Sequence, residues 1–285
     1  MDFLLKIVEF ILAFILSFFG GAGGDTVAHS YRLPDNVASC ELIVHYIDVG
    51  QGDCIFVELP KDKAMLIDAG TNESVATVCD YIDSRGEDRL DYVIATHPHA
   101  DHIGGMDGVL DEFEVGTFYM PDVQNNTRTF ESMLDSLDAN GADVKEAEAG
   151  VVVWEDDELK IQIVSPVEHH YDDINDYSAV VKLTYKDTDF LFAGDAQKYA
   201  EGKITSDISA DVLKVGHHGS DTSSGESFLE KVNPDYAVIS AGVDNEYGHP
   251  HREVMDRLTK RGIKIFRTDM TGTVVIGSDG ESIEY

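Results

Sequence analysis

The sequence predicts an α/β (α+β) protein in which two packed β-sheets are flanked by helices on their outer faces. Short β-branched strands recur along the chain, some of them separated by stretches with helical periodicity, and no fixed-period repeat interrupts them. This alternation favours layers of sheet and helix around a common core. With 285 residues, 43% of them hydrophobic, the chain is long enough to bury such a core without disulfides.

The predicted strands are rich in β-branched and aromatic residues and are bounded by turn residues. They cover Leu42–Val49, Cys54–Leu59, Ala64–Ile67, Tyr92–Thr96, Leu159–Val164, Ala179–Tyr185, Phe190–Ala193, Val212–Val215, Tyr236–Ser240, Lys264–Arg267 and Thr273–Ile276. Several follow one another directly, which favours meandering sheets.

The predicted helices carry apolar side chains at helical spacing between a capping residue and a glycine. Asn72 caps the first, which ends at Gly86, and Thr129 caps the second, which ends at Gly141. A further helix is predicted at Glu253–Arg261.

The N-terminal residues differ in composition from the rest. Residues 3–19 are almost continuously hydrophobic, and small residues follow from Gly20 to Gly24. This stretch resembles the apolar part of a signal peptide, although Asp2 and Glu9 depart from the usual positive N-terminus. An uncleaved anchor, a helix in the membrane interface and a helix docked on the core are alternatives.

We therefore expect three regions along the chain. Residues 1–24 are predicted to be a signal or anchor helix, with membrane attachment through residues 3–19. Residues 25–40 are predicted to be a linker, and residues 41–285 a single domain of an exported or membrane-anchored protein.

The charge of the chain limits its partners. There are 54 acidic residues against 21 basic ones, so the formal net charge is −33. Such a chain repels polyanions over most of its surface, which argues against a protein that coats DNA or RNA. Any phosphate chemistry would need a local source of positive charge. The three cysteines, Cys40, Cys54 and Cys79, lack metal-like spacing and are interpreted as small hydrophobic residues.

Metal ions bound by histidines are a candidate source of that charge, because histidines gather in three short loops. The groups are His97, His99 and His102, then His217 and His218, then His249 and His251. Alternate side chains of an extended segment point the same way, so His97 and His99 can share one metal ion. Asp101 and His102 follow where the chain turns, and they can reach a second ion. Imidazole and carboxylate ligands favour Zn²⁺, with Mn²⁺ or iron as alternatives.

Two later segments can complete such a centre. A buried strand ends in Gly194-Asp195, where a carboxylate would be costly without a cation, so Asp195 is predicted to bridge the two ions. The strand Val212–Val215 presents His217 and His218 in the same manner.

These motifs resemble those of a known family. The run from His97 to His102 resembles the metal motif of the metallo-β-lactamase superfamily. Other segments resemble the hydrolase domain of the ComEC/Rec2 competence proteins and their stand-alone relatives: Asp48–Asp53, Leu66–Gly70, Ala193–Asp195, Leu213–Ser220 and Tyr247–His251. The likeness extends from Glu41 to the C-terminus and implies an αββα sandwich with a dinuclear site at one edge.

The resemblance also implies roles for individual residues. It assigns His97 and His99 to the first metal, Asp101 and His102 to the second, Asp195 to both, and His217 rather than His218 as the last ligand of the second metal. Asp68 matches an aspartate that holds a ligand histidine by a hydrogen bond. Many members have another first-metal histidine where this chain has Asn175-Asp176-Tyr177-Ser178, so that ligand is missing or replaced.

Further residues are candidates for catalysis or substrate binding. Asp101 could orient an attacking water, and His249 or His218 could protonate the leaving group or stabilise the transition state. A turn decorated with histidines is the structural alternative for His249 and His251. The candidates for supporting the ligands or touching the substrate are Asp48, Asp53, Asp176, Ser220 and His251.

The leading expectation is a hydrolase with two divalent ions that cleaves phosphodiester bonds, like the nuclease activity attributed to the ComEC-type domain. The alternatives are a hydrolase of a small ester, such as a phosphocholine ester or a lactone, and a non-catalytic envelope component of DNA uptake that binds single-stranded DNA. A nuclease should place basic residues around the metals. The available ones are Lys182, Lys186, Lys198, Lys203, Lys214, Arg252, Arg257, Lys260 and Arg267. The oligomeric state is not predicted.

Overall fold

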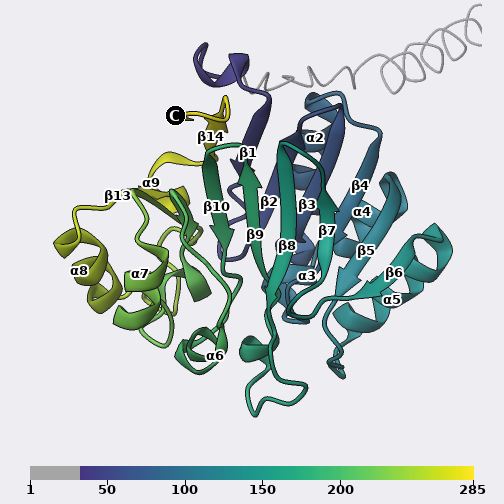
Figure 1. The fold of residues 1–285 in the computed structure, drawn as a ribbon. Coiled ribbons are helices and arrows are strands. Elements are labelled where there is room, and N and C mark those ends of the chain that lie inside the picture. Colours follow the sequence, from purple (N-terminus) through teal and green to yellow (C-terminus); the bar gives the residue numbers. More distant parts are fainter. Residues whose placement is uncertain (1–32) are drawn as a thin grey trace, which may run out of the picture. The chain divides into compact units, whose positions relative to one another are not determined.

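The computed structural model describes residues 33–285, which form one compact unit of two sheets with helices on their outer faces (Figure 1). The first sheet contains, in spatial order, β15 (Ile283–Glu284), β14 (Val274–Ser278), β1 (Leu42–Tyr46), β2 (Cys54–Leu59), β3 (Lys63–Ala69), β4 (Arg89–Ile94), β5 (Glu114–Met120) and β6 (Asp143–Glu146). The second contains β13 (Lys264–Arg267), β12 (Tyr236–Ile239), β11 (Val212–Lys214), β10 (Thr188–Phe192), β9 (Val180–Tyr185), β8 (Leu159–Ser165) and β7 (Val152–Glu155).

The helices lie between these strands in the chain. The α-helices are α2 (Val75–Ser84), α3 (Ala100–Ile103), α4 (Met106–Glu112), α5 (Arg128–Asn140), α6 (Lys198–Lys203), α7 (Glu226–Val232), α8 (Arg252–Lys260) and α9 (Thr268–Thr271). Short 3₁₀ turns occur at η1 (Val37–Ser39), η2 (Asn72–Ser74), η3 (Ile174–Tyr177) and η4 (Gly216–Gly219).

Three hydrophobic clusters hold the layers together. The central one lies between the sheets, where side chains such as Val44 of β1 and Phe192 of β10 meet. A second joins the first sheet to α2, α4 and α5, and a third joins the second sheet to α6, α7 and α8. Burial of each large apolar side chain contributes about 1.5–3 kcal/mol before entropy costs. The predicted sandwich of two mixed sheets with flanking helices is therefore confirmed.

Both sheets are mixed, and this determines where loops gather. β3, β4 and β5 run parallel in the first sheet, and β10, β11 and β12 run parallel in the second. Loops that follow parallel neighbours leave the same edge of a sheet, and ligands commonly bind in open α/β sheets at that edge. The histidine motifs and Gly194-Asp195 all follow these strands.

The strands and helices predicted between residues 33 and 285 are all present, most of them with shifted ends, but both predicted caps are wrong. Ser74 rather than Asn72 precedes α2, and Asn72 begins the short turn η2. The helix α5 begins at Arg128, and Thr127 rather than Thr129 is its cap, because the Thr127 side chain accepts a hydrogen bond from the Phe130 N–H. Several elements were not predicted, among them β5, β6, β7, α4, α6 and α7. They are short or mostly polar, and α4 spans only 7 residues.

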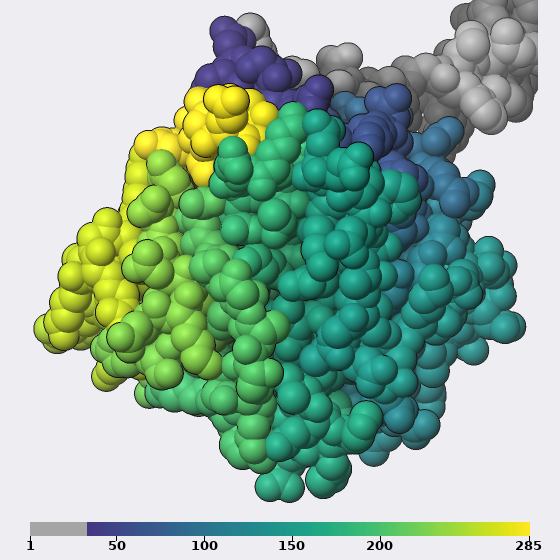
Figure 2. All heavy atoms as spheres, viewed as in Figure 1, coloured from purple at the N-terminus to yellow at the C-terminus, as the bar shows by residue number. Residues whose placement is uncertain are grey.

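The compact unit begins at Leu33, before the predicted domain start at residue 41. Leu33 and Val37 are buried against Ile43 of β1. The C-terminal residues lie beside this segment (Figure 2), and the Asn36 side chain donates to the Glu284 carboxylate at 3.0 Å. The predicted signal or anchor helix and residues 25–32 of the predicted linker lie outside the described residues. Between residues 33 and 285, no helix has the length and apolar character that a membrane crossing requires.

Candidate metal centre

The first histidine motif lies in the loop that leaves β4. His97 follows the strand, His99 precedes α3, and Asp101 and His102 lie in the first turn of that helix. The loop after β1 packs against this turn, since the Asp53 N–H donates to the Asp101 carbonyl at 3.1 Å. A Cβ at Gly52 would lie 2.4 Å from the same carbonyl oxygen, so only glycine permits this close approach. The loop after β1 thus holds the motif in place together with the motif's own helix, α3.

Asp68, at the end of β3, fixes the orientation of this loop. It accepts hydrogen bonds from the Thr96 N–H at 2.8 Å and the Thr96 hydroxyl at 2.7 Å, and its other contact is with His102 Nδ1 at 2.7 Å. Its backbone adopts a positive φ of 58°, which turns the carboxylate inward. Because Nδ1 of His102 is engaged, Nε2 is the ring nitrogen left for a ligand role. This placement matches the supporting role that the resemblance implies for Asp68.

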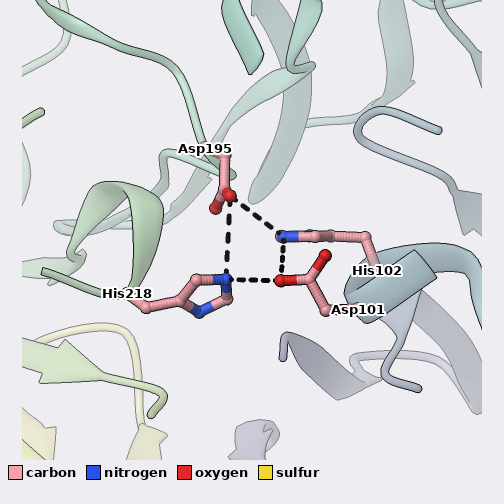
Figure 3. A group of neighbouring side chains, drawn as sticks. All are labelled: Asp101, His102, Asp195 and His218. Carbon is pink, nitrogen blue, oxygen red and sulfur yellow. Dashed lines mark ion pairs between the residues drawn. The ribbon is translucent and has the colours of Figure 1, made fainter. Parts of the chain in front are cut away.

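Four side chains from three loops converge into one cluster: Asp101, His102, Asp195 and His218 (Figure 3). Asp195 Oδ2 lies 3.3 Å from His102 Nε2 and 3.6 Å from His218 Nε2. Asp101 Oδ2 lies 3.2 Å from His218 Nε2. Asp101 and His102 come from the first sheet and lie more than 90 residues before Asp195 and His218 of the second, and the packing of the two sheets brings them to one place.

Asp195 also faces the other histidines of the site. Its Oδ2 lies 3.9 Å from His97 Nε2 and 3.7 Å from His217 Nε2, and His97 Nε2 lies 3.0 Å from His99 Nδ1. One carboxylate oxygen therefore has four imidazole nitrogens within 4.0 Å. This central position is the one expected of a bridging ligand.

The two neighbouring histidines His217 and His218 differ in their surroundings, although both lie near Asp195. His218 lies in the cluster with Asp101 and His102, whereas His217 is partly exposed and contacts the Thr222 hydroxyl through Nδ1 at 3.0 Å. Both histidines have positive φ, 48° and 52°, so the chain at η4 does not follow an extended path. The assignment of His217 as the last ligand of the second metal stays a prediction.

The charges of the cluster favour a cation. Burial lowers the pKa of His218, but the carboxylates of Asp195 and Asp53 outweigh this effect and raise it to about 10. Burial likewise opposes protonation of His102, yet the pKa of His102 is raised well above its usual value by Asp195, Asp68 and Asp101. The carboxylates thus draw positive charge into a buried site.

The donor set fits divalent metal ions. His102 Nε2, His218 Nε2 and Asp195 Oδ1 are buried without a hydrogen-bond partner, which is costly unless a cation satisfies them. Imidazole nitrogens and carboxylate oxygens are ligands that zinc and other first-row divalent ions accept. The described residues therefore form a candidate site for divalent metals.

His218 is supported by a buried ion pair that the sequence did not reveal. Lys214 Nζ donates to Asp53 Oδ2 at 2.7 Å, and the side chains of Lys214 and Asp53 are 0% and 1% exposed. Asp53 Oδ1 lies 3.3 Å from His218 Nδ1, which also contacts the Ser240 carbonyl at 3.1 Å. The predicted supporting role of Asp53 thus has a structural counterpart, with Lys214 behind it.

Other predicted supporting residues lie around the site without facing it. Asp48 accepts from the Gly50 N–H, and Asp176 accepts from the N–H groups of Gln197 and Ala200 at the start of α6. Ser220 accepts from the Thr222 N–H within its own loop, and His251 accepts from the Asp221 N–H of that loop and donates to the Tyr247 carbonyl of its own. None of these four lines the cavity described next.

The segment that replaces the missing histidine contacts the centre through Ser178. Its hydroxyl accepts from the Asp195 N–H at 3.0 Å and lies 3.3 Å from His97 Nδ1. Ser178 therefore holds the predicted bridging carboxylate and a predicted ligand together. A serine between two recognised motifs gave no signal that would have identified it.

A cavity of about 420 Å³ opens onto the metal centre. It is lined by Gln51, His99, Ala100, Asp101, Asn125, Thr127, Asn175, Asp195, His217, His218, Tyr247 and His249. All three predicted catalytic residues, Asp101, His218 and His249, line this space. Burial together with the neighbouring His218 and His217 lowers the pKa of His249 to about 4. Near neutral pH its ring is an uncharged hydrogen-bonding group.

The cavity wall differs from the expectation for a nuclease. No lysine or arginine from residues 33–285 lines it, although such residues were expected around the metals. Lys214 comes close but is buried and paired with Asp53. The neutral polar side chains of Gln51, Asn125, Thr127 and Asn175 occupy the wall instead, and no motif in the sequence indicates their place there.

Replacing Asp68 with asparagine should weaken metal binding. Asparagine has the same shape and tolerates the left-handed backbone, but it lacks the charge that holds His102 and Thr96. Loss of such an outer partner typically lowers metal affinity about 10–100-fold. Competition with a chromophoric chelator measures this affinity. Asp48→Asn is the matched control, because Asp48 caps a turn away from the cavity. Equal metal affinities of Asp68→Asn and the parent protein would contradict the role of Asp68.

Comparison with known proteins identifies a matching family and similar proteins. Residues 47–243 match the family model described as the Metallo-beta-lactamase superfamily. The chain is 32% identical over 256 residues to ComE operon protein 3 of Bacillus subtilis, covering 83% of this chain and 33% of that protein. It is 31% identical over 255 residues to Competence protein ComA of Neisseria gonorrhoeae, covering 87% and 34%. The chain thus spans about a third of the length of these relatives.

Solved structures share the fold at low identity. CmlA, a diiron beta-hydroxylase from Streptomyces venezuelae, matches with a TM-score of 0.57 and 15% identity over 84% of this chain and 54% of that one. Zn(2+)-bound PqqB from Methylobacterium extorquens matches with a TM-score of 0.53 and 10% identity over 82% and 100%. At such identities the likeness concerns the arrangement of sheets and helices alone.

Proposed function

Since this chain belongs to the metallo-beta-lactamase superfamily, we propose that it is a metal-dependent hydrolase that cleaves phosphodiester bonds. The single observation that carries the proposal is the position of Asp195, whose Oδ2 has four imidazole nitrogens within 4.0 Å. Asp195 and the imidazoles around it would together hold two divalent ions. Zn²⁺ is the first candidate and Mn²⁺ the second.

Each ion has its own group of donors. His97 and His99 would hold one ion, and Asp101, His102 and His218 the other, with Asp195 shared. When bound, such ions supply Lewis acidity, acidify a water and neutralise charge on the oxygen of a scissile group. They would also provide the positive charge that a chain with a net charge of −33 lacks.

The residues of the chain position the reactants. Asp101 Oδ1 is free to accept a hydrogen bond from the attacking water, since Oδ2 is the atom nearest His218. The uncharged His249 ring borders the same cavity and can donate to an oxygen of the scissile group. Asp68 and Lys214 act behind the ligands, by holding His102 and Asp53 in place.

Phosphodiesters are the preferred substrate class because of the names of the relatives. One of them is named a competence protein, and a nucleic-acid backbone is the substrate that this name favours. A second candidate, hydrolysis of a small ester such as a phosphocholine ester or a lactone, is favoured by one observation, the lack of lysine and arginine on the cavity wall between residues 33 and 285.

A substrate panel tests the proposal. The full chain, loaded with Zn²⁺ or Mn²⁺, is assayed with bis(4-nitrophenyl) phosphate, single-stranded DNA and the lactone dihydrocoumarin. Hydrolysis of both phosphodiesters is expected. Cleavage of the lactone alone would favour the small-ester reading, and bound but uncleaved DNA would favour a non-catalytic component of DNA uptake.

A further inference from the structure

We infer that Tyr247 is a stacking platform for a nucleobase beside the metal centre, so that the site takes single-stranded or very short nucleic acids. This inference rests on the proposed phosphodiester hydrolysis. It adds the part of the substrate that is recognised and the residue that recognises it.

Tyr247 lies in the cavity wall with much of its ring open to solvent. The residue is 59% exposed, which is unusual for a tyrosine next to a buried cluster. Its ring is nearly parallel to that of His249, with 5.6 Å between centroids and 18° between planes. His249 is in turn stacked on His218 at 6.2 Å and 27°. A series of flat rings therefore leads from the metal centre to an open aromatic face.

The loop that carries Tyr247 is fixed in place. The Asn245 side chain donates to the carbonyls of Gly242 and His249 and accepts from the His249 N–H. His251 Nε2 donates to the Tyr247 carbonyl at 3.1 Å. These bonds close the turn on both sides of the tyrosine, so a ligand would meet a preformed surface.

The charge of the cavity favours stacking over phosphate contacts. Proteins that bind nucleic acids usually neutralise phosphates with lysine or arginine. Within residues 33–285, the cavity wall contains neither, and the chain as a whole is strongly acidic. Stacking on an aromatic side chain does not depend on such contacts and accepts any base.

The wall also offers a polar group that has no partner in the protein. Gln51 Oε1 accepts from the Gly242 N–H at 3.1 Å, which fixes the orientation of the amide. Its Nε2 is buried without a hydrogen-bond partner. An amide donor in the same cavity as Tyr247 can satisfy an oxygen of a bound nucleotide.

These features exclude a long duplex as the preferred substrate. Bases within a duplex are stacked on one another and do not present a free face to Tyr247. A duplex also carries the highest density of phosphates, which this cavity does not neutralise with side chains. A single base next to the scissile phosphate fits the platform.

Two substrates with the same leaving group test the inference. Thymidine 5′-(4-nitrophenyl phosphate) carries a base, and ethyl 4-nitrophenyl phosphate does not. In the parent protein kcat/KM should be higher for the thymidine ester, and Tyr247→Ala should reduce this preference about tenfold, mainly through KM. Tyr247→Phe should keep it. Tyr199→Ala is the matched control, since Tyr199 is 54% exposed but lies on α6 outside the cavity wall, and it should leave both activities unchanged.

A binding signal that does not require catalysis gives the second readout. A dinucleotide containing 2-aminopurine loses fluorescence when its base stacks, and it can be titrated into the metal-free protein. Quenching by the parent, Tyr247→Phe and Tyr199→Ala but not by Tyr247→Ala is expected. Equal quenching by Tyr247→Ala, or an unchanged substrate preference, would overturn the inference while leaving the proposed hydrolysis intact. If neither ester is hydrolysed but the quenching is preserved, the proposed function is refuted and base stacking on Tyr247 is not.

Discussion

The replacement Asp195→Asn should nearly abolish phosphodiester hydrolysis, lowering kcat/KM by at least about a thousandfold, well beyond the 10–100-fold typical for losing an outer partner of a metal ligand. The reason is geometric, since Asp195 Oδ2 lies within 4.0 Å of nitrogens from His97, His102, His217 and His218. Asparagine keeps the shape but removes the charge that both ions would share. Initial rates with bis(4-nitrophenyl) phosphate, measured with excess Zn²⁺ or Mn²⁺, provide the comparison.

A carboxylate elsewhere in the same sheet provides the control. Asp211 precedes β11, and its side chain accepts from the Asp189 N–H at 2.7 Å, at the opposite end of the strands from the metal centre. Asp211→Asn should keep most of the activity. If Asp195→Asn hydrolysed the substrate at a rate comparable to that of Asp211→Asn, Asp195 would not be a metal ligand.

The second large effect concerns stability. Lys214→Met should lower the free energy of unfolding by about 3–5 kcal/mol, because the buried carboxylate of Asp53 loses its ammonium partner and keeps the longer contact with His218 Nδ1 at 3.3 Å. The pair is almost fully enclosed, with exposures of 0% and 1%, so water cannot replace the lost ammonium group. Denaturant unfolding of the metal-free protein measures the change.

Lys182→Met is the matched control for this experiment. Lys182 is also on a strand of the second sheet, but its partners Asp207 and Asp189 are 76% and 27% exposed, so both keep contact with water when the lysine is removed. The expected cost from losing these ion pairs is below about 1 kcal/mol. The double variant Asp53→Leu/Lys214→Met should recover part of the stability lost in Lys214→Met. An unfolding free energy of Lys214→Met equal to that of the parent would show that the buried pair does not support the fold.

Much of the architecture was predictable because its signals are local. Strands such as Cys54–Leu59 and Lys264–Arg267 have the same bounds in the prediction and in the structure, since turn residues bracket short β-branched runs. Elements that lack this contrast between turn residues and β-branched residues were not predicted. The strand β5 begins with Glu114 and contains Gly116, and α4 is too short to display a helical period.

The candidate site was predictable where residue type and spacing carry the chemistry. The motif His97 to His102 and the carboxylate of Asp195 come together as expected. The choice between His217 and His218 as the last ligand depends on backbone angles, because both residues adopt positive φ. No pattern in the sequence indicates that left-handed turn.

The supporting groups could not be predicted, because they depend on contacts between distant segments. Lys214 and Asp53 are 161 residues apart and pair only when the two sheets pack. Ser178 has no motif of its own, and it contacts His97 from a segment 81 residues away. The cavity wall formed by Gln51, Asn125 and Tyr247 likewise combines three separate loops.

The most direct test of the central claim is the number of metal ions bound per chain. The purified full-length protein, equilibrated with Zn²⁺ or Mn²⁺ and freed of loosely bound ions, can be measured by elemental analysis against protein concentration. We expect two ions per chain in the parent and fewer than two in Asp195→Asn. A parent protein that binds one ion or none, or an Asp195→Asn variant that still binds two, would contradict a centre built around a shared carboxylate.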